Sequence, residues 1–232
     1  MNLIITGANR GLGLMLVLEA AKRGHTVWAG VRKVSESGSL KDMARQYPGK
    51  IEIVPLDVTN EEGISSLAER LHKEGRSIDS IINNAAVLIG REHSLEELQI
   101  ADLERTMDVN VYGPIRMVKH FMRLLPSHGS STIVNVSSAS GSFERAYGGD
   151  YSYAISKAAL NLFSQQLHHL LEPKGSRVYA VHPGWLRTDM GGPQATNDPS
   201  MPAPGIIDLA EGKIECERAN VFVDHNGKTL PR

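Results

Sequence analysis

The sequence lacks most features of secreted, membrane-bound or polyanion-binding proteins. Its single cysteine, Cys216, cannot form an internal disulfide, which favours a reducing compartment. The net charge is -1 at pH 7 and the basic residues are scattered, so we expect no nucleic acid partner. No apolar run approaches the roughly 20 residues that cross a bilayer. Met1 leads directly into a predicted strand, so we expect no export signal. We therefore expect a soluble, cytoplasmic protein that binds no membrane.

Metal-binding patterns are also missing, because Cys216 has no Cys or His neighbour at ligand spacing. Aromatic residues make up only 5% of the chain, but hydrophobic residues reach 41% and charged residues 22%. This composition supplies enough apolar surface for a sizeable core and is far from that of disordered chains. We expect no metal and a single domain over residues 1–232.

Short β-branched runs alternate with longer amphipathic stretches along the whole chain. The predicted strands are 3–6, 26–30, 51–56, 80–83, 132–137, 177–182 and 221–223, and the predicted helices are 11–23, 40–47, 61–74, 95–109, 114–125 and 151–171. This alternation is typical of a doubly wound, Rossmann-like α/β fold, with a seven-stranded parallel sheet between two helical layers. Two predicted loops, 141–150 and 191–205, follow strands and are expected to overhang the ligand site.

A glycine-rich turn connects the first predicted strand to the first predicted helix. Three glycines, Gly7, Gly11 and Gly13, permit a tight turn and close backbone approach to a pyrophosphate. The free N–H groups at the helix start favour bound phosphate. A purely structural turn is the alternative, but its position between strand and helix favours a dinucleotide. The residues of this turn that are predicted to contact the dinucleotide are Gly7, Asn9, Arg10, Gly11, Leu12 and Gly13.

The end of the second predicted strand bears on the identity of the dinucleotide. An Asp or Glu there would bind the ribose 2′-hydroxyl of NAD, but the sequence after Gly30 is Val31-Arg32-Lys33. Arg32 and Arg10 are suited to clamp a 2′-phosphate, which predicts that NADP(H) is favoured over NAD(H). If both are ordinary surface arginines, the preference stays open.

Two further strand ends are candidates for cofactor contact. Asp57 can accept a hydrogen bond from the adenine amino group while Val58 lies beside the ring, although such a dipeptide is also typical of a solvated turn. Small residues after the fourth strand, at Asn84, Ala85 and Ala86, let a cofactor lie against backbone. A plain loop with an Asx turn explains that segment equally well.

The predicted catalytic group combines a strand-end serine with a tyrosine and a lysine on one helix. Tyr153 and Lys157 are four residues apart, so they share a helix face, and the ammonium is expected to lower the pKa of the phenol. In the reducing direction, Ser138 polarises a carbonyl oxygen, Tyr153 protonates it, and NADPH supplies hydride. The rival phenols Tyr147 and Tyr151 have no cation four residues further on.

Together these residues resemble the short-chain dehydrogenase/reductase family. Its motifs TGxxxGxG, DV, NNAG, a middle-helix Asn, a strand-end Ser, YxxxK and PG are met in order between Thr6 and Gly184, except that Ala86 replaces the last Gly of NNAG. The resemblance extends over nearly the whole chain, to the branch of sniffer-type carbonyl reductases and C-factor-like proteins. It implies a cofactor-binding part over about residues 1–130 and a catalytic and substrate part over about 131–232.

The resemblance also implies roles that the residues alone do not show. Asn110 matches the fourth catalytic residue, which holds a water in a proton relay to the lysine. Residues Pro183, Gly184, Leu186 and Thr188 match positions that border the nicotinamide, with Thr188 near its carboxamide. Family members commonly pair two helices across a two-fold axis, which implies a homodimer or homotetramer.

Two alternatives remain open at this point, and a third is disfavoured. The interval from Ser138 to Tyr153 is about two residues longer than is usual in the family, so Ser140 is a second candidate for the catalytic serine. A dinucleotide-binding signalling protein of C-factor type with little turnover is a different function for the same fold. The few residues after Met190 argue against a third reading, a sugar-nucleotide epimerase or dehydratase with an extra substrate domain.

Overall fold

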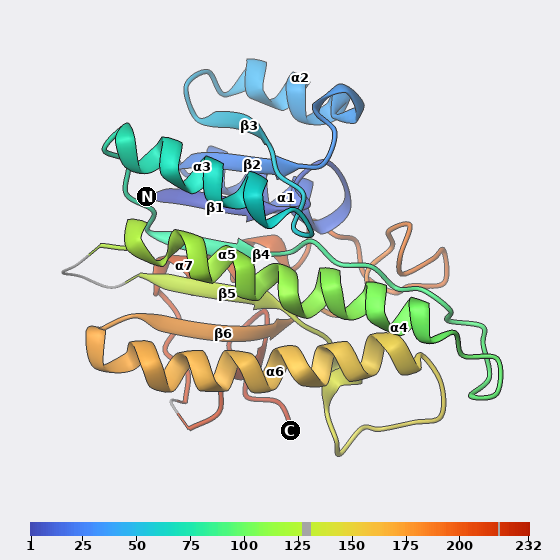
Figure 1. Cartoon of the computed structure of the whole chain (residues 1–232). Helices are drawn as coiled ribbons and strands as arrows, with labels where there is room; N and C mark the ends of the chain where they lie inside the picture. The colour runs from blue at the N-terminus through green and yellow to red at the C-terminus, as the bar shows by residue number, and fades with distance from the viewer. Residues whose placement is uncertain (127–130, 218) are drawn as a thin grey trace.

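The computed structural model describes residues 1–126, 131–217 and 219–232, and its centre is one parallel sheet (Figure 1). The strand order is β3-β2-β1-β4-β5-β6-β7, and every paired neighbour is parallel. The strands are β1 (Asn2–Thr6), β2 (Thr26–Val31), β3 (Ile51–Pro55), β4 (Ser80–Asn83), β5 (Thr132–Val136), β6 (Arg177–His182) and β7 (Phe222–Asp224). The predicted doubly wound, seven-stranded sheet is therefore confirmed.

Helices cover both faces of the sheet. The α-helices are α1 (Gly11–Lys22), α2 (Gly38–Gln46), α3 (Glu61–Lys73), α4 (Ile100–Met107), α5 (Gly113–Phe121), α6 (Tyr151–Leu171) and α7 (Ala203–Glu211). Short 3₁₀ turns are η1 (Val34–Glu36), η3 (Met122–Leu124), η4 (Ala139–Gly141) and η5 (Glu172–Lys174), and a π-helical segment, η2 (Asp108–Tyr112), joins α4 to α5. Figure 1 shows α3, α5 and α6 in front of the sheet, with α1 and α7 behind it.

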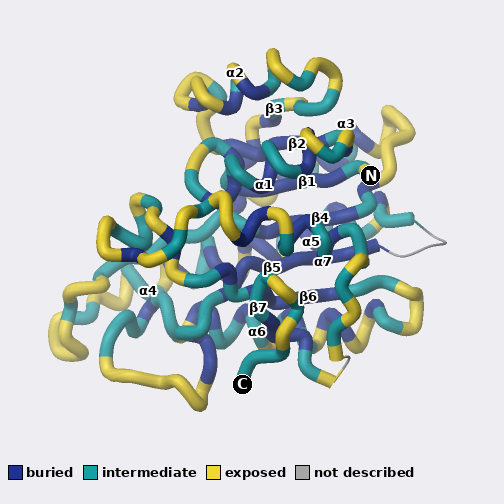
Figure 2. Tube along the Cα trace, turned by 180° about the vertical axis from the view of Figure 1, so that it is seen from behind, coloured by how far each residue is buried: buried dark blue, intermediate teal, exposed yellow. Residues whose placement is uncertain are grey.

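Alternation along the strands divides the core into two layers. In β1, Leu3 and Ile5 belong to the cluster packed under α1, α2 and α7, whereas Ile4 belongs to the cluster under α3, α5 and α6. All three side chains are fully buried, as the dark central strands of Figure 2 show. Burying each such side chain contributes about 1.5–3 kcal/mol relative to exposure. The β-branched runs therefore form strands because both of their faces are covered.

The sheet places its ligand edge where the strand order reverses. Strand β1 pairs with β2 on one side and with β4 on the other, so the connections from β1 and β4 leave in opposite directions. In open parallel sheets a crevice forms at this switch point, beyond the carboxyl ends of the strands. The glycine turn after β1 and residues 84–99 after β4 both begin at this edge.

The largest differences from the predicted elements lie in two places. The helix predicted over 95–109 begins only at Ile100, and the predicted loop 191–205 was wrong at its end because α7 begins at Ala203. Pro202 and Pro204 indicate a loop in sequence, but proline fits the first turn of a helix, where its missing N–H has no partner.

The boundary expected at about residue 130 falls on residues 127–130, outside the described part of the chain. Among the helices that the structure describes, none combines the length and apolarity needed to span a bilayer.

Candidate active site

The glycine turn forms one end of the cleft at the switch point. Gly7 and Gly11 have φ of 65° and 54°, which side chains rarely adopt. A Cβ at Gly13 would lie 2.2 Å from the Gly7 carbonyl oxygen and 2.6 Å from Asn84 Nδ2. Arg10 precedes α1 without a side-chain cap on the helix. The first turn of α1 therefore offers free N–H groups behind a backbone that has no space for side chains.

Thr6 ties this turn to the segment after β4. Its Oγ1 accepts hydrogen bonds of 3.0 Å from the backbone N–H groups of Asn84 and Ala85, and the Asn84 side chain donates to the Thr6 oxygen at 2.9 Å. These bonds hold the two strand ends side by side. The predicted role of Asn84 therefore has a structural counterpart, since its amide shapes the wall against which a cofactor would lie.

Arg32, Asp57 and Val58, which are predicted to contact the adenosine, also line the cleft. One oxygen of Asp57 accepts from the backbone and hydroxyl of Thr59, at 2.9 and 2.8 Å, in an Asx turn. Arg32 makes no hydrogen bond or ion pair with the described residues, whereas Arg10 pairs with Asp189 from the loop after β6. Both members of that pair are largely exposed, so it stabilises the fold little and can be exchanged for a phosphate.

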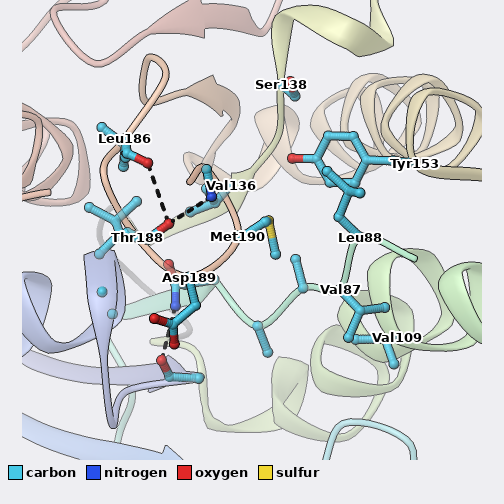
Figure 3. Close-up of a pocket in the computed structure, with 18 of the residues that line it drawn as sticks. Val87, Leu88, Val109, Val136, Ser138, Tyr153, Leu186, Thr188, Asp189 and Met190 are labelled. Atoms are coloured by element: carbon cyan, nitrogen blue, oxygen red, sulfur yellow. Dashed lines mark hydrogen bonds between the residues drawn. The ribbon is translucent and has the colours of Figure 1, made fainter. Parts of the chain in front are cut away.

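The loop after β6 supplies the wall opposite the glycine turn. Gly184 has a φ of 94°, and a Cβ there would meet Asn197 at 2.8 Å. Thr188 Oγ1 donates to the Leu186 oxygen at 3.4 Å and accepts from the Gly191 N–H at 3.2 Å (Figure 3). A Cβ on Gly11 would lie 3.2 Å from the Thr188 methyl group. This loop and the glycine turn therefore approach each other across the cleft.

The predicted catalytic side chains meet at the other end of the cleft. Ser138 follows β5, and its hydroxyl donates to Ser140 Oγ at 3.3 Å and accepts from the Ser140 N–H at 3.2 Å. Figure 3 shows the Tyr153 hydroxyl pointing into the cleft near Ser138. One turn further along α6, the Lys157 ammonium lies 5.4 Å from the centre of the Tyr153 ring. The structure therefore brings Ser138, Tyr153 and Lys157 together.

The electrostatics of this group differ from the expectation. Burial raises the pKa of Tyr153 to about 12, against the opposing effect of a hydrogen bond with Ser138. Burial also lowers the pKa of Lys157 to about 7. The prediction that Lys157 lowers the pKa of the phenol is wrong for this structure, because desolvation dominates and makes the ammonium itself easier to deprotonate. At neutral pH the phenol is protonated and Lys157 is near its midpoint.

Asn110 lies beside this group rather than in the wall of the cleft. It sits in the π-helical segment η2, where its Oδ1 accepts from the Val87 N–H at 2.8 Å. Its Nδ2 donates to the Val87 oxygen at 2.9 Å and to Ser156 Oγ at 3.0 Å. The side chain is buried and its Nδ2 makes two hydrogen bonds, so it connects the segment after β4 to the helix that carries Tyr153.

One cleft of about 1790 Å³ contains all the other predicted site residues. This volume exceeds the roughly 300–1,000 Å³ of common small-ligand pockets. The predicted residues that line it are Gly7, Asn9, Arg10, Gly11, Leu12, Gly13, Arg32, Asp57, Val58, Asn84, Ala85, Ala86, Ser138, Tyr153, Lys157, Pro183, Gly184, Leu186 and Thr188, together with the alternative Ser140. The glycine turn and free N–H groups at one end fit an extended dinucleotide, and the catalytic group at the other end fits its substrate.

Sequence reasoning missed His182 and Arg91, which also line the cleft. His182 ends β6, and its Nδ1 accepts from the Ala139 N–H at 3.2 Å, so it supports the turn that carries Ser138. Burial lowers the pKa of His182, which favours the neutral ring that this hydrogen bond requires. The sequence signal that could have identified His182 was its position directly before Pro183 and Gly184. Arg91 lies in a segment that had no recognisable motif.

Comparison with known proteins identifies the class. The family model described as short chain dehydrogenase matches residues 1–199. A short chain dehydrogenase of Penicillium aethiopicum is 32% identical over 98% of this chain and 97% of its own length. The chain therefore belongs to the short-chain dehydrogenase/reductase family, a family of oxidoreductases.

More particular likenesses lie within that family. The structure of the carbonyl reductase Sniffer of D. melanogaster superposes with a TM-score of 0.91 at 28% identity, covering 100% of this chain and 99% of that one. An NADPH-bound carbonyl reductase from chicken fatty liver gives a TM-score of 0.89 at 26% identity, covering 100% and 98%. The C-signal protein of Myxococcus xanthus is 35% identical over 66% of this chain and 92% of its own length. The predicted family and branch are thereby confirmed.

Proposed function

We propose that this protein reduces carbonyl compounds with NADPH, and catalyses the reverse oxidation of alcohols. The observation that carries the proposal is the position of Tyr153, whose hydroxyl points into the cleft near Ser138 and whose pKa desolvation raises to about 12. A carbonyl reductase needs a proton donor and an electrophilic hydrogen bond at one oxygen, and this pair supplies both. The dinucleotide supplies the hydride.

Four residues of the chain have separate roles in the proposed reaction. Ser138 donates a hydrogen bond to the carbonyl oxygen, and Tyr153 transfers its proton to that oxygen as the negative charge develops. Lys157, with a pKa of about 7, can then return a proton toward the phenolate at neutral pH. Asn110 positions the segment after β4 against α6 through Val87 and Ser156. Its predicted water relay to Lys157 remains part of the proposal.

A preference for NADP(H) over NAD(H) also belongs to the proposal. Arg32 stands at the end of β2 and makes no hydrogen bond or ion pair with the described residues, although its charge adds to the effect of Lys33 in lowering the pKa of Glu36. Neither Val31 nor Lys33 beside it supplies a carboxylate. Arg10, the second predicted clamp, is held only by an exposed ion pair. The chicken carbonyl reductase with bound NADPH and a Burkholderia multivorans neighbour with bound NADP are consistent with this choice.

Replacing Tyr153 by Phe tests the reaction. The variant removes the proton donor but keeps the ring, so turnover of aldehydes and ketones should fall by at least about 10³-fold, within the range for loss of acid catalysis. NADPH affinity, measured by nicotinamide fluorescence, should stay nearly unchanged. Tyr151→Phe, on the same helix but outside the cleft, is the matched control. Retained turnover in Tyr153→Phe would overturn the catalytic assignment.

A dinucleotide-binding signalling protein is the second candidate, favoured by the 35% identity with C-signal. It predicts NADPH binding with negligible turnover on a broad panel of aldehydes, ketones and quinones. A biological effect that survives Tyr153→Phe would support it, because signalling would then need the fold and not the phenol.

We further propose a cytoplasmic homodimer or homotetramer. Leu162 on α6 is 62% exposed, so this residue is not in the core of the monomer. Ile155 on α6 and Ile115 on α5 are exposed on neighbouring helices. Covering them in a second copy removes apolar surface from water. Light scattering coupled to size exclusion measures the oligomeric state, and a monomer at micromolar concentration would contradict the assembly.

A further inference from the structure

A cation that the proposed chemistry does not use lies at the substrate end of the cleft. Arg91, in the segment between β4 and α4, lines the cleft together with Tyr147 and Tyr153. Its Nη1 donates to the Met190 oxygen at 3.1 Å, which joins it to the loop after β6. Its Nε lies 3.5 Å from Asp150 Oδ1. Three different segments therefore meet at this guanidinium.

The backbone of Asp150, which contacts Arg91, has an unfavourable conformation. Asp150 has a φ of 46°, and it is the one non-glycine among the described residues with a positive φ. It stands at the N-cap of α6, where an aspartate normally accepts from the helix N–H groups, but it makes no such bond. Instead its Oδ2 accepts from the Tyr147 hydroxyl at 2.6 Å. Strain of this kind persists where the surrounding structure requires it, often at a functional site.

The ion pair leaves most of the guanidinium's donors unused. At 3.5 Å the contact with Asp150 is too long for a hydrogen bond. Asp150 Oδ1 is buried and has no hydrogen-bond partner among the described residues. Arg91 Nη2 likewise makes no hydrogen bond with the described part of the chain, and the side chain is 39% exposed. Asp150 thus holds the Arg91 guanidinium in position but leaves N–H donors of that guanidinium without acceptors. A guanidinium with free donors can bind a carboxylate through two parallel hydrogen bonds.

The same charges act on the proton donor. Burial is the main cause of the raised pKa of Tyr153, and among the smaller contributions Arg91 lowers that pKa while Asp150 raises it. The Arg91 guanidinium is therefore close enough for its charge to change the pKa of Tyr153. Leu88 and Met190 line the same cleft as Arg91 and Tyr153, so part of its wall is apolar (Figure 3).

We propose that Arg91 is a specificity-determining residue that binds a carboxylate of the substrate, so that the preferred substrates are aldehydes or ketones that carry an acid group. This inference rests on the proposed carbonyl reductase function. A short apolar linker between carbonyl and carboxylate suits the walls formed by Leu88 and Met190. Asp150 is then a positioning residue, which holds Arg91 in place until the substrate's anion takes its unused donors.

The test compares acids with neutral esters of the same shape. The substrates are succinic and adipic semialdehyde and meta- and para-carboxybenzaldehyde, each beside its methyl ester, assayed with saturating NADPH. The measured quantity is the ratio of kcat/KM for the acid to kcat/KM for its ester. For at least one linker length we expect a ratio of tenfold or more, as for hydrogen bonds between charged groups. The gain should appear mainly in KM, because the contact is remote from the reacting carbon.

Variants locate the effect. Arg91→Met should bring the ratio near one, and Arg91→Lys should leave an intermediate ratio, because it keeps the charge without the planar fork. Arg145→Met is the matched control, since Arg145 is an exposed cation of the neighbouring loop that does not line the cleft. Circular dichroism and NADPH fluorescence check that each variant folds and binds the dinucleotide.

Each result bears on one of the two proposals or on both. Esters and acids turned over equally by the unmodified protein, or a preference that survives Arg91→Met, would overturn the carboxylate site and leave the reductase function standing. If neither acids nor esters are turned over although NADPH binds, the reductase function fails, and the carboxylate site fails with it.

Discussion

The Lys157 ammonium donates its hydrogen bond of 2.8 Å to the backbone oxygen of Val136, at the buried end of β5. Its side chain is 2% exposed, and burial lowers its pKa from 10.5 to about 7. A buried ammonium with this partner gives up its proton near neutrality, so the site changes its charge within the physiological pH range. The same shift makes the stability of the fold depend on pH.

We expect the free energy of unfolding, measured without dinucleotide, to rise between pH 7 and pH 10. In this window the unfolded chain keeps Lys157 protonated while the folded chain releases the proton, because the folded pKa is the lower one. The unfolded state then binds more protons, so stability increases with pH by up to about 1.4 kcal/mol per unit. Above pH 10 the raised pKa of Tyr153 acts in the opposite direction.

Urea denaturation of Lys157→Met checks this expectation. The variant should unfold with a nearly flat pH dependence and should be more stable than the unmodified protein at pH 6–7, where burying the charge costs most. Lys22→Met, which changes an exposed lysine at the end of α1, is the control and should keep the rise. A flat profile for the unmodified protein would contradict the lowered pKa.

Arg32→Asp should exchange the cofactor preference. The change removes the predicted phosphate clamp and adds a carboxylate for the ribose hydroxyl, so NADPH affinity should fall by about 10- to 150-fold, as for loss of 1.5–3 kcal/mol in a charged hydrogen bond. NADH affinity should fall less or improve. Fluorescence titration measures both. Lys41→Asp, on α2 and outside the cleft, makes the same charge change as a control. Equal losses for the two dinucleotides would show that Arg32 binds no 2′-phosphate.

Ser138→Ala and Ser140→Ala distinguish the two candidate serines. Ser138 lowers the pKa of Tyr153, whereas Ser140 lowers the pKa of Tyr147, so the two serines act on different phenols. Loss of the polarising hydroxyl should lower kcat by about 10²–10³-fold, so Ser138→Ala should show this loss and Ser140→Ala a loss below about tenfold. Steady-state kinetics with one aldehyde and saturating NADPH decide it. The reverse order would reassign the role to Ser140.

Gly13→Ala should damage both the fold and the dinucleotide site. The new Cβ would lie 2.2 Å from the Gly7 oxygen, a backbone atom that cannot move without opening the turn. We expect a loss of about 1–3 kcal/mol, as for overpacking, together with weaker NADPH binding. Gly38→Ala is the control, because a Cβ there meets nothing within 4 Å and φ is not positive. Unchanged stability and affinity in Gly13→Ala would disprove the close approach.

Local patterns predicted most of the site, because its main parts are local in sequence. The turn containing Gly7 and Gly13 lies within one βα connection, and Tyr153 and Lys157 lie within one helical turn. The seven strands follow from β-branched runs that need cover on both faces. Features that depend only on strand order along the chain and on the periodicity of its residues could therefore be predicted from the sequence.

Burial and long-range contact were not predictable in the same way. The sign of the pKa shift at Tyr153 depends on desolvation by neighbours that residue spacing does not reveal. The contacts of Arg91 with Asp150 and Met190 join three loops that are 59 and 99 residues apart along the chain. The hydrogen bond of His182 to Ala139 likewise spans 43 residues. Such contacts exist only after the sheet has brought the loops together.

The π-helical turn η2 restricts where residues can be inserted into or deleted from this chain. Asn110 faces Val87 and Ser156 because the backbone between α4 and α5 makes a π-helical turn over Asp108–Tyr112. Deleting one residue from α4 would rotate everything before the deletion by about 100° relative to everything after it. Either the Asn110 side-chain amide would lose its hydrogen bonds with Val87, or α4 would lose its packing against α6. We therefore expect insertions and deletions to be tolerated between Arg91 and Ile100 but not between Ile100 and Asn110.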